Sequence, residues 1–140
     1  MSRTLKELFF SQPLAVLATQ DHGQPYGSLV AFAATEDLKY ILFATIRSTR
    51  KYSNLSKNPR VAMVIDNRTN KEIDFETAVA VTAVGTVREL EKDRFVDLYL
   101  SRHPHLRHFV TSPGCALLGM EVESYYIVRQ FQNVTQFRME

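Results

Sequence analysis

The sequence predicts a mainly β domain, an antiparallel barrel of about seven strands with short helices at its corners. Two observations favour this fold class. Short apolar segments rich in valine, threonine and isoleucine follow one another through tight polar turns, which is typical of antiparallel pairing. A helical pattern does not follow nearly every strand, and the motif G-x-G-x-x-G does not occur, which argues against a parallel doubly wound sheet.

The chain length predicts one domain spanning residues 1–140, because 140 residues suffice for a single hydrophobic core. Hydrophobic residues make up 45% and charged residues 23%, which is an ordinary globular composition rather than that of a disordered chain. We find no internal repeat, low-complexity tract or linker.

Charge and hydropathy exclude some classes of partner. The formal net charge of +2 gives no broad basic field, so we expect no nucleic-acid binding. Apolar runs stay well below the roughly 18–20 residues that span a bilayer, and the N-terminus lacks a signal peptide pattern, so we expect no membrane association. The single cysteine, Cys115, cannot form an internal disulfide. We therefore expect a cytoplasmic protein in which Cys115 is buried and structural.

The first third of the chain predicts one helix and three strands. The opening M-S-R-T-L-K-E-L-F-F-S-Q has the pattern of a short amphipathic helix. The apolar segment Pro13–Gln20 predicts a strand, Asp21–Pro25 has turn chemistry, and Tyr26–Thr35 predicts the second strand of a hairpin. After another polar turn, Lys39–Thr45 alternates in polarity and predicts the third strand.

The middle of the chain predicts two more strands around a polar segment. Arg60–Asp66 is apolar and short, Asn67–Thr77 is polar and turn-rich, and Ala78–Leu90 alternates with many valines and threonines. Gly85 interrupts this long strand, and we expect it to mark a bulge or a close approach of another backbone.

The last third predicts helices followed by two closing strands. Helical spacing over Glu91–Arg102 ends at Pro104, and His105–Val110 predicts a second short helix. The segments Cys115–Val122 and Ser124–Phe131 then predict two separate strands.

A polar turn between the strand Lys39–Thr45 and a helix predicted over Thr49–Lys57 is the strongest functional signal. Three cations and three hydroxyls lie in or beside it: Arg47, Arg50, Lys51, Thr45, Ser48 and Thr49. Backbone N–H groups and the dipole at a helix start favour an anion, whereas cations there oppose the dipole, so local stability does not require them. The pattern indicates a phosphate site. The alternative is a capped helix with Ser48 or Thr49 as N-cap and a solvated basic turn.

The segment T-I-R-S-T-R-K-Y-S-N-L-S-K-N-P-R-V, residues 45–61, resembles the FMN-binding split-barrel family related to pyridoxamine 5′-phosphate oxidase. Weaker support comes from the L-A-V-L-A-T strand, the V-T-A-V-G-T-V strand and His103-Pro104. The resemblance extends over nearly the whole chain. It implies a split, Greek-key-like β-barrel and a homodimer with FMN at the subunit interface. It also implies a flavin-dependent oxidoreductase with a small-molecule electron donor such as NAD(P)H.

The same resemblance implies a set of cofactor-binding residues. The phosphate would contact Ser48, Thr49, Arg50 and Lys51; the flavin ring would lie near Ser28, Leu29, Val30, Ala44 and Thr45; and Asn67 and Asn70 would reach the flavin or its ribityl chain. The partner subunit would contribute a residue near the closing strands, such as Gln130 or Phe131.

The chain departs from true pyridoxamine phosphate oxidases, which carry a longer C-terminal segment with substrate-binding Trp and Arg residues. It has no tryptophan and ends at Glu140, so we do not expect vitamin B6 oxidation. The alternatives are a flavin carrier or sensor without its own substrate, or a relative that binds F420 or haem. No residue stands out as catalytic.

Three other groups of residues invite functional interpretations. The histidines of H-P-H-L-R-H, residues 103–108, raise a metal or haem hypothesis, but Pro104 breaks the geometry, so we expect a solvated corner and no metal site. Four carboxylates fall in or beside the polar segment, and we expect them to be solvated: Asp66, Glu72, Asp74 and Glu76. Four late aromatics are expected to be core or dimer contacts: Tyr125, Tyr126, Phe131 and Phe137.

Overall fold

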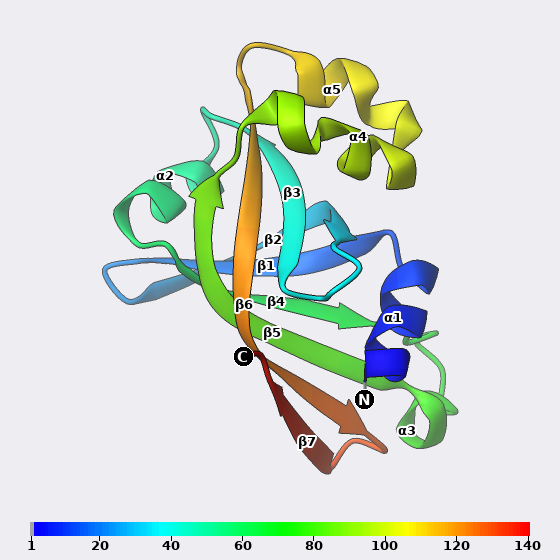
Figure 1. Ribbon diagram of the computed structural model, residues 1–140. Helices are drawn as coiled ribbons and strands as arrows, with labels where there is room; N and C mark the ends of the chain where they lie inside the picture. Colours follow the sequence, from blue (N-terminus) through cyan, green and yellow to red (C-terminus); the bar gives the residue numbers. More distant parts are fainter. Residues whose placement is uncertain (1) are drawn as a thin grey trace.

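The computed structural model describes residues 2–140 and shows an antiparallel β-barrel (Figure 1). Its strands are β1 (Leu14–Asp21), β2 (Gln24–Ala34), β3 (Tyr40–Ile46), β4 (Arg60–Asp66), β5 (Val79–Glu89), β6 (Cys115–Arg129) and β7 (Asn133–Arg138). They follow the order β3-β2-β1-β4-β5-β6-β7, and pairing of β3 with β6 closes the barrel, leaving β7 as an added strand. The predicted fold class is confirmed.

Short helices occupy the corners, as the sequence predicts. They are α1 (Ser2–Ser11), α2 (Arg50–Lys57), α3 (Asp74–Thr77), α4 (Lys92–Arg102) and α5 (Arg107–Thr111), with a 3₁₀ turn η1 (Pro104–Leu106) before α5. None of the helices within residues 2–140 combines the length and apolar character needed to cross a membrane.

The closing strands differ from the prediction. The segments predicted as two strands, Cys115–Val122 and Ser124–Phe131, form one continuous strand, β6, which ends at Arg129. The seventh strand is Asn133–Arg138, which the sequence did not predict. Within β6, the pairing with β5 jumps from Val84–Ser124 to Gly85–Val122. Glu123 is therefore an extra residue, accommodated as a β-bulge. A bulge bends a strand without ending it, and the polar residue at this point was therefore misread as a boundary.

Gly85 lies where two backbones come too close for a side chain. A Cβ atom built at this position would lie 2.0 Å from the carbonyl oxygen of Glu121. The predicted close approach is confirmed, and it coincides with the bulge in β6.

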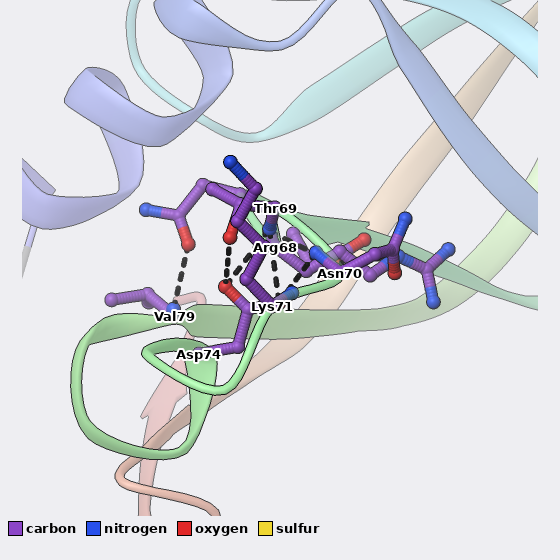
Figure 2. A network of polar contacts seen from close by, with 8 residues as sticks. Arg68, Thr69, Asn70, Lys71, Asp74 and Val79 are labelled. Atoms are coloured by element: carbon purple, nitrogen blue, oxygen red, sulfur yellow. Dashed lines mark hydrogen bonds and ion pairs between the residues drawn. The ribbon is translucent and has the colours of Figure 1, made fainter.

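The polar segment after β4 is more ordered than its composition suggests. The Asp74 carboxylate accepts hydrogen bonds from the backbone N–H groups of Thr69, Asn70 and Lys71, at 2.7–3.3 Å, and from the Thr69 hydroxyl at 2.8 Å (Figure 2). Bonds to the charged form hold the pKa of Asp74 below its ordinary value. Asp74 therefore shapes this loop and starts the unpredicted helix α3.

Two hydrophobic clusters stabilise the fold. The first fills the barrel and is closed at one end by α1, whose Leu5, Leu8 and Phe9 are buried; the Phe9 ring meets Phe32 edge to face at 5.7 Å. The amphipathic helix expected at the N-terminus is thus confirmed. The second cluster lies outside the barrel, where α4 and α5 cover β2, β3 and β6 (Figure 1).

His103 belongs to this second packing region rather than to a solvated corner. Its side chain is 2% exposed, its Nε2 donates to the Phe32 carbonyl at 2.7 Å, and its ring packs against Tyr99. Burial lowers the pKa of His103, so the neutral ring is the form that fits. The expectation of a solvated corner is wrong for His103 because α4 ends against β2, whereas His105 and His108 are exposed.

No cluster of three or more metal-ligating side chains occurs in the part of the chain that the structure describes. Cys115 is buried, as predicted, and burial raises the pKa of its thiol. Tyr125 is fully buried and Phe137 packs against the barrel core, whereas Phe131 is 71% exposed.

Candidate functional site

A gap between β2 and β3 defines the candidate site. The two strands pair only where Phe32–Ala34 meets Ile41–Phe43. Beyond these residues they diverge: β2 continues beside β1 alone, and β3 beside β6 alone. Figure 1 shows β3 running steeply across the direction of β1 and β2. One edge of β2, from Gln24 to Ala31, therefore has no strand partner within residues 2–140 and presents backbone donors and acceptors.

The N-terminus of α2 adjoins the strand β3 that borders this gap. Thr49 is the N-cap: its Oγ1 accepts from the Tyr52 N–H at 3.3 Å, and it lies 2.9 Å from both the Ile46 carbonyl oxygen and the Thr45 hydroxyl. The N-cap interpretation is therefore confirmed for Thr49. Since Thr45 is 1% exposed and bonds to Thr49, both hydroxyls already stabilise the turn.

The three cations of this turn have different interaction partners. Arg47 forms an ion pair with Glu89 at the end of β5 and donates to the Pro113 carbonyl at 2.8 Å. Hydrogen bonding to Arg47 lowers the pKa of Glu89. Arg50 lies over the Tyr26 ring at 5.7 Å from its centroid, and neither Arg50 nor Lys51 has a carboxylate partner among residues 2–140.

The expected ring-contacting residues of β2 alternate between the two faces of the strand. Val30 is 4% exposed and faces the barrel core, whereas Leu29 is 67% exposed on the outer face. Ser28 pairs with the core residue Leu17, and its Oγ is the one buried side-chain polar atom in residues 2–140 without a hydrogen-bond partner. Because buried hydroxyls normally have partners, this hydroxyl is free to form a further hydrogen bond.

The fold places the remaining predicted residues in different parts of the molecule. Ala44 packs in the cluster beneath α4, with its side chain 6% exposed. Asn67 accepts from the Val79 N–H at 2.8 Å and lines a small cavity against α1, away from Leu29. Asn70, in contrast, lines a cavity of about 220 Å³ together with Leu29, so the structure brings these two residues together.

The outer face around Leu29 is apolar across several strands. The strand register places Leu29, Val16, Val64, Thr82 and Tyr126 in one row from β2 to β6. Leu14 and Leu29 are largely exposed here, and their neighbours are partly exposed. Exposed apolar surface of this kind is typical of an interaction site.

Sequence reasoning missed three residues of this region. Tyr26 supports Arg50, and Glu89 with Tyr52 anchors Arg47, since the Tyr52 hydroxyl donates to the Glu89 carboxylate at 3.0 Å. Tyr52 had a sequence signal, because it lies on the helix that starts at the turn. Glu89 had none, since it is 42 residues from Arg47 along the chain.

Comparisons with known proteins agree with this architecture. The family model described as pyridoxamine 5′-phosphate oxidase matches residues 1–129. A haem-binding protein from Mycobacterium smegmatis superposes with a TM-score of 0.80 at 15% identity; the match covers 94% of this chain and only 55% of that protein. None of the curated proteins matches the chain.

Two further structures have similar lengths. A Clostridium acetobutylicum protein related to general stress protein 26 of B. subtilis, of the pyridoxinephosphate oxidase family, gives a TM-score of 0.75 at 18% identity, covering 98% of this chain and 93% of the other. A FAD-binding protein from Mesorhizobium loti gives 0.72 at 15% identity, covering 91% of each chain. At these identities the likeness shows a shared fold.

Proposed function

We propose that this chain, which belongs to the pyridoxamine 5′-phosphate oxidase family, binds FMN and acts as a flavin-dependent oxidoreductase. One observation carries the proposal. Arg50 and Lys51 lie in the first turn of α2 without carboxylate partners among residues 2–140, although cations there oppose the helix dipole. A bound phosphate would remove this conflict, because it accepts from both side chains and from the free N–H groups of the helix start.

The roles of the hydroxyls in this turn differ in the proposal. The Ser48 side chain is exposed and free to donate to a phosphate oxygen, together with Arg50 and Lys51. Thr49 instead positions the turn, because its hydroxyl is engaged by the cap and by Thr45.

The open edge of β2 suits the polar edge of a flavin ring. Between Ser28 and Val30, β2 pairs with β1 on one side only, so the backbone groups on its other edge are free to bond the ring, and the Ser28 hydroxyl has no partner within residues 2–140. Bound FMN would supply the redox chemistry, while these groups would anchor and orient the ring. Catalytic residues are not needed for this assignment, and we name none.

We further propose a homodimer with the flavin groove at the subunit interface. Two copies that pack their apolar outer faces would bury Leu29, Val16 and Val64. Gln130, at the turn between β6 and β7, would then reach the groove of the partner. The buried Cys115 thiol suits a reducing cytoplasm.

The positions of the histidines make FMN a better candidate for the cofactor than haem. His103 is buried and its Nε2 is committed to the Phe32 carbonyl, which removes the histidine best held in place as an axial ligand. F420 also carries a phosphate, so the α2 turn does not separate it from FMN.

The test is an absorption spectrum of the purified protein, repeated after adding FMN, F420 and haemin separately and after gel filtration. We expect a retained flavin band near ~450 nm, a property of the cofactor. A Soret band with haemin and no retained flavin would contradict the proposal. Steady-state turnover with NAD(P)H distinguishes an oxidoreductase from a flavin carrier or sensor.

A further inference from the structure

A second cavity, of about 490 Å³, lies between the loop after β4 and the turn that joins β6 to β7. Two largely exposed rings, Phe75 and Phe131, line it together with the small apolar side chains of Ala78, Ala80 and Val128. This volume is within the range of ordinary small-molecule pockets, which run from roughly 300 to 1,000 Å³. None of the residues expected to hold the FMN phosphate lines it.

The two phenylalanines form an exposed aromatic pair. Their rings meet edge to face with centroids 4.8 Å apart, and the residues are 55% and 71% exposed. Large aromatic side chains are usually buried, so two of them facing solvent at the rim of a cavity indicate a surface that binds another flat ring.

The cavity is held in shape before any ligand arrives. On one side, the four donors gathered by Asp74 fix residues 69–71 (Figure 2). Asn70, in this loop, has a φ of 62°. On the other side, Gln130 and Phe131 have φ values of 49° and 70°. Residues other than glycine rarely adopt such conformations, and they concentrate at binding sites.

The charges around the cavity disfavour an anion. Asp66 pairs with Arg68 at 3.1 Å, whereas Asp74 stays negatively charged and is stabilised by its hydrogen bonds. The charged residues that line the cavity are three carboxylates and two cations, which leaves a net charge of minus one: Asp66, Glu72, Asp74, Arg68 and Lys71. A negatively charged ligand would meet repulsion here, whereas a neutral ring would not.

We propose that this cavity binds a planar aromatic small molecule without negative charge, in contact with Phe75 and Phe131. The cavity shares Asp66, Arg68 and Asn70 with the smaller cavity that contains Leu29, so the two adjoin. The ligand would therefore lie next to the proposed flavin site. Its role there as the organic reactant of the flavin rests on the proposed function. Binding itself does not depend on it.

Two probes of matched shape and different charge test the proposal. Naphthalene-2-carboxamide is neutral and 2-naphthoate is anionic, and each is titrated into the ¹³C-methyl-labelled protein with and without FMN. We expect the amide to shift the methyl signals of Ala78, Ala80 and Val128 in a saturable way. One repulsive charge at contact distance is worth about 1 kcal/mol in water, so the naphthoate should bind at least about fivefold more weakly.

Substitution of an exposed ring provides the second arm. Phe131→Leu should weaken amide binding by about two- to tenfold, the value of an aromatic contact. The matched control is Phe10→Leu on α1. Phe10 is 81% exposed and does not line this cavity, so this variant should bind as the wild type does.

The outcomes separate this inference from the FMN proposal. Amide binding in a protein that retains no FMN would support the cavity and contradict the proposed cofactor. Equal affinities for the two probes, unchanged affinity in Phe131→Leu, or shifts confined to other methyl groups would overturn the inference. One further result would overturn the inference: a wild type that is dimeric and binds neither probe, and whose dimer dissociates in Phe131→Leu. Phe75 and Phe131 would then form a subunit contact.

Discussion

Arg47 in the turn between β3 and α2 forms an ion pair with Glu89 at the end of β5. The Tyr52 hydroxyl donates to the same carboxylate at 3.0 Å, so strand, turn and helix are joined at one point. The pair assigns different roles to cations that look equivalent in the sequence. Arg47 holds the turn in place, whereas Arg50 and Lys51 have no carboxylate partner among residues 2–140 and are available to the proposed phosphate.

The proposed phosphate site makes Lys51 important for FMN affinity. Lys51→Ala removes a charge-assisted hydrogen bond, which is worth about 1.5–3 kcal/mol, so Kd should rise about 10- to 150-fold. Fluorescence titration of the apoprotein with FMN measures the change, and urea unfolding should show a stability close to that of the wild type.

Lys57→Ala is the matched control, because Lys57 lies on the same helix but in its last turn. Its side chain is exposed and 3.9 Å from Asp21. We expect wild-type FMN affinity. Equal losses in the two variants would point to a general charge effect, and no loss in Lys51→Ala would remove the phosphate assignment.

The close approach at the bulge makes Gly85 sensitive to a single methyl group. In Gly85→Ala the new Cβ would lie 2.0 Å from a backbone oxygen that cannot move alone, so β5 and β6 must shift. We expect a loss of at least about 2 kcal/mol in the free energy of unfolding.

Gly114→Ala is the control for this substitution, since a Cβ there meets no atom within 4 Å. Its stability should stay within about 0.5 kcal/mol of wild type, as at other unconstrained surface positions. Urea denaturation followed by circular dichroism compares the three proteins. Similar stabilities for both variants would show that the strands at Gly85 relax easily.

His103 predicts a pH dependence of stability. Burial lowers its pKa in the folded state, so the folded protein binds fewer protons than the unfolded chain. Its contribution is fully present above the unfolded pKa of about 6.5, and it is lost as the pH falls from there towards the folded pKa. The wild type should therefore lose more stability between neutral and mildly acidic pH than His103→Gln, which does not titrate.

His108→Gln tests whether this behaviour belongs to the buried histidine, because His108 is exposed in the neighbouring helix α5. It should follow the wild-type pH profile in urea denaturation. If His103→Gln also follows that profile, the buried ring does not control the acid sensitivity.

The apolar outer face predicts an oligomeric state. Val16 lies between Leu29 and Val64 on this face, and Val16→Glu would place a charge within the proposed interface. Sedimentation velocity should show the wild type at twice the chain mass of 16.1 kDa and the variant nearer to one chain mass, with weaker FMN binding. Phe10→Glu, on α1, should remain dimeric. A wild type that sediments as one chain would refute the dimer.

Local sequence signals predicted much of the fold because they depend on neighbours in the chain. The alternation in β5, the turn before Tyr26 and the helix end before Pro104 report backbone preferences that act over a few residues. The same holds for Thr49, whose capping bond reaches only three residues ahead. The continuous strand β6 was missed for the opposite reason, since its bulge at Glu123 depends on pairing with β5, which is distant in the chain.

By itself, the sequence determined the antiparallel class, the short corner helices and the close approach at Gly85, and it predicted an anion site at the turn before α2. Only the tertiary structure decided which cations are free, because Glu89 reaches Arg47 across 42 residues. It likewise decided that His103 is buried against Phe32, and that Asn70 rather than Asn67 adjoins Leu29. These relationships depend on contacts between distant segments, and local propensity contains no information about such contacts.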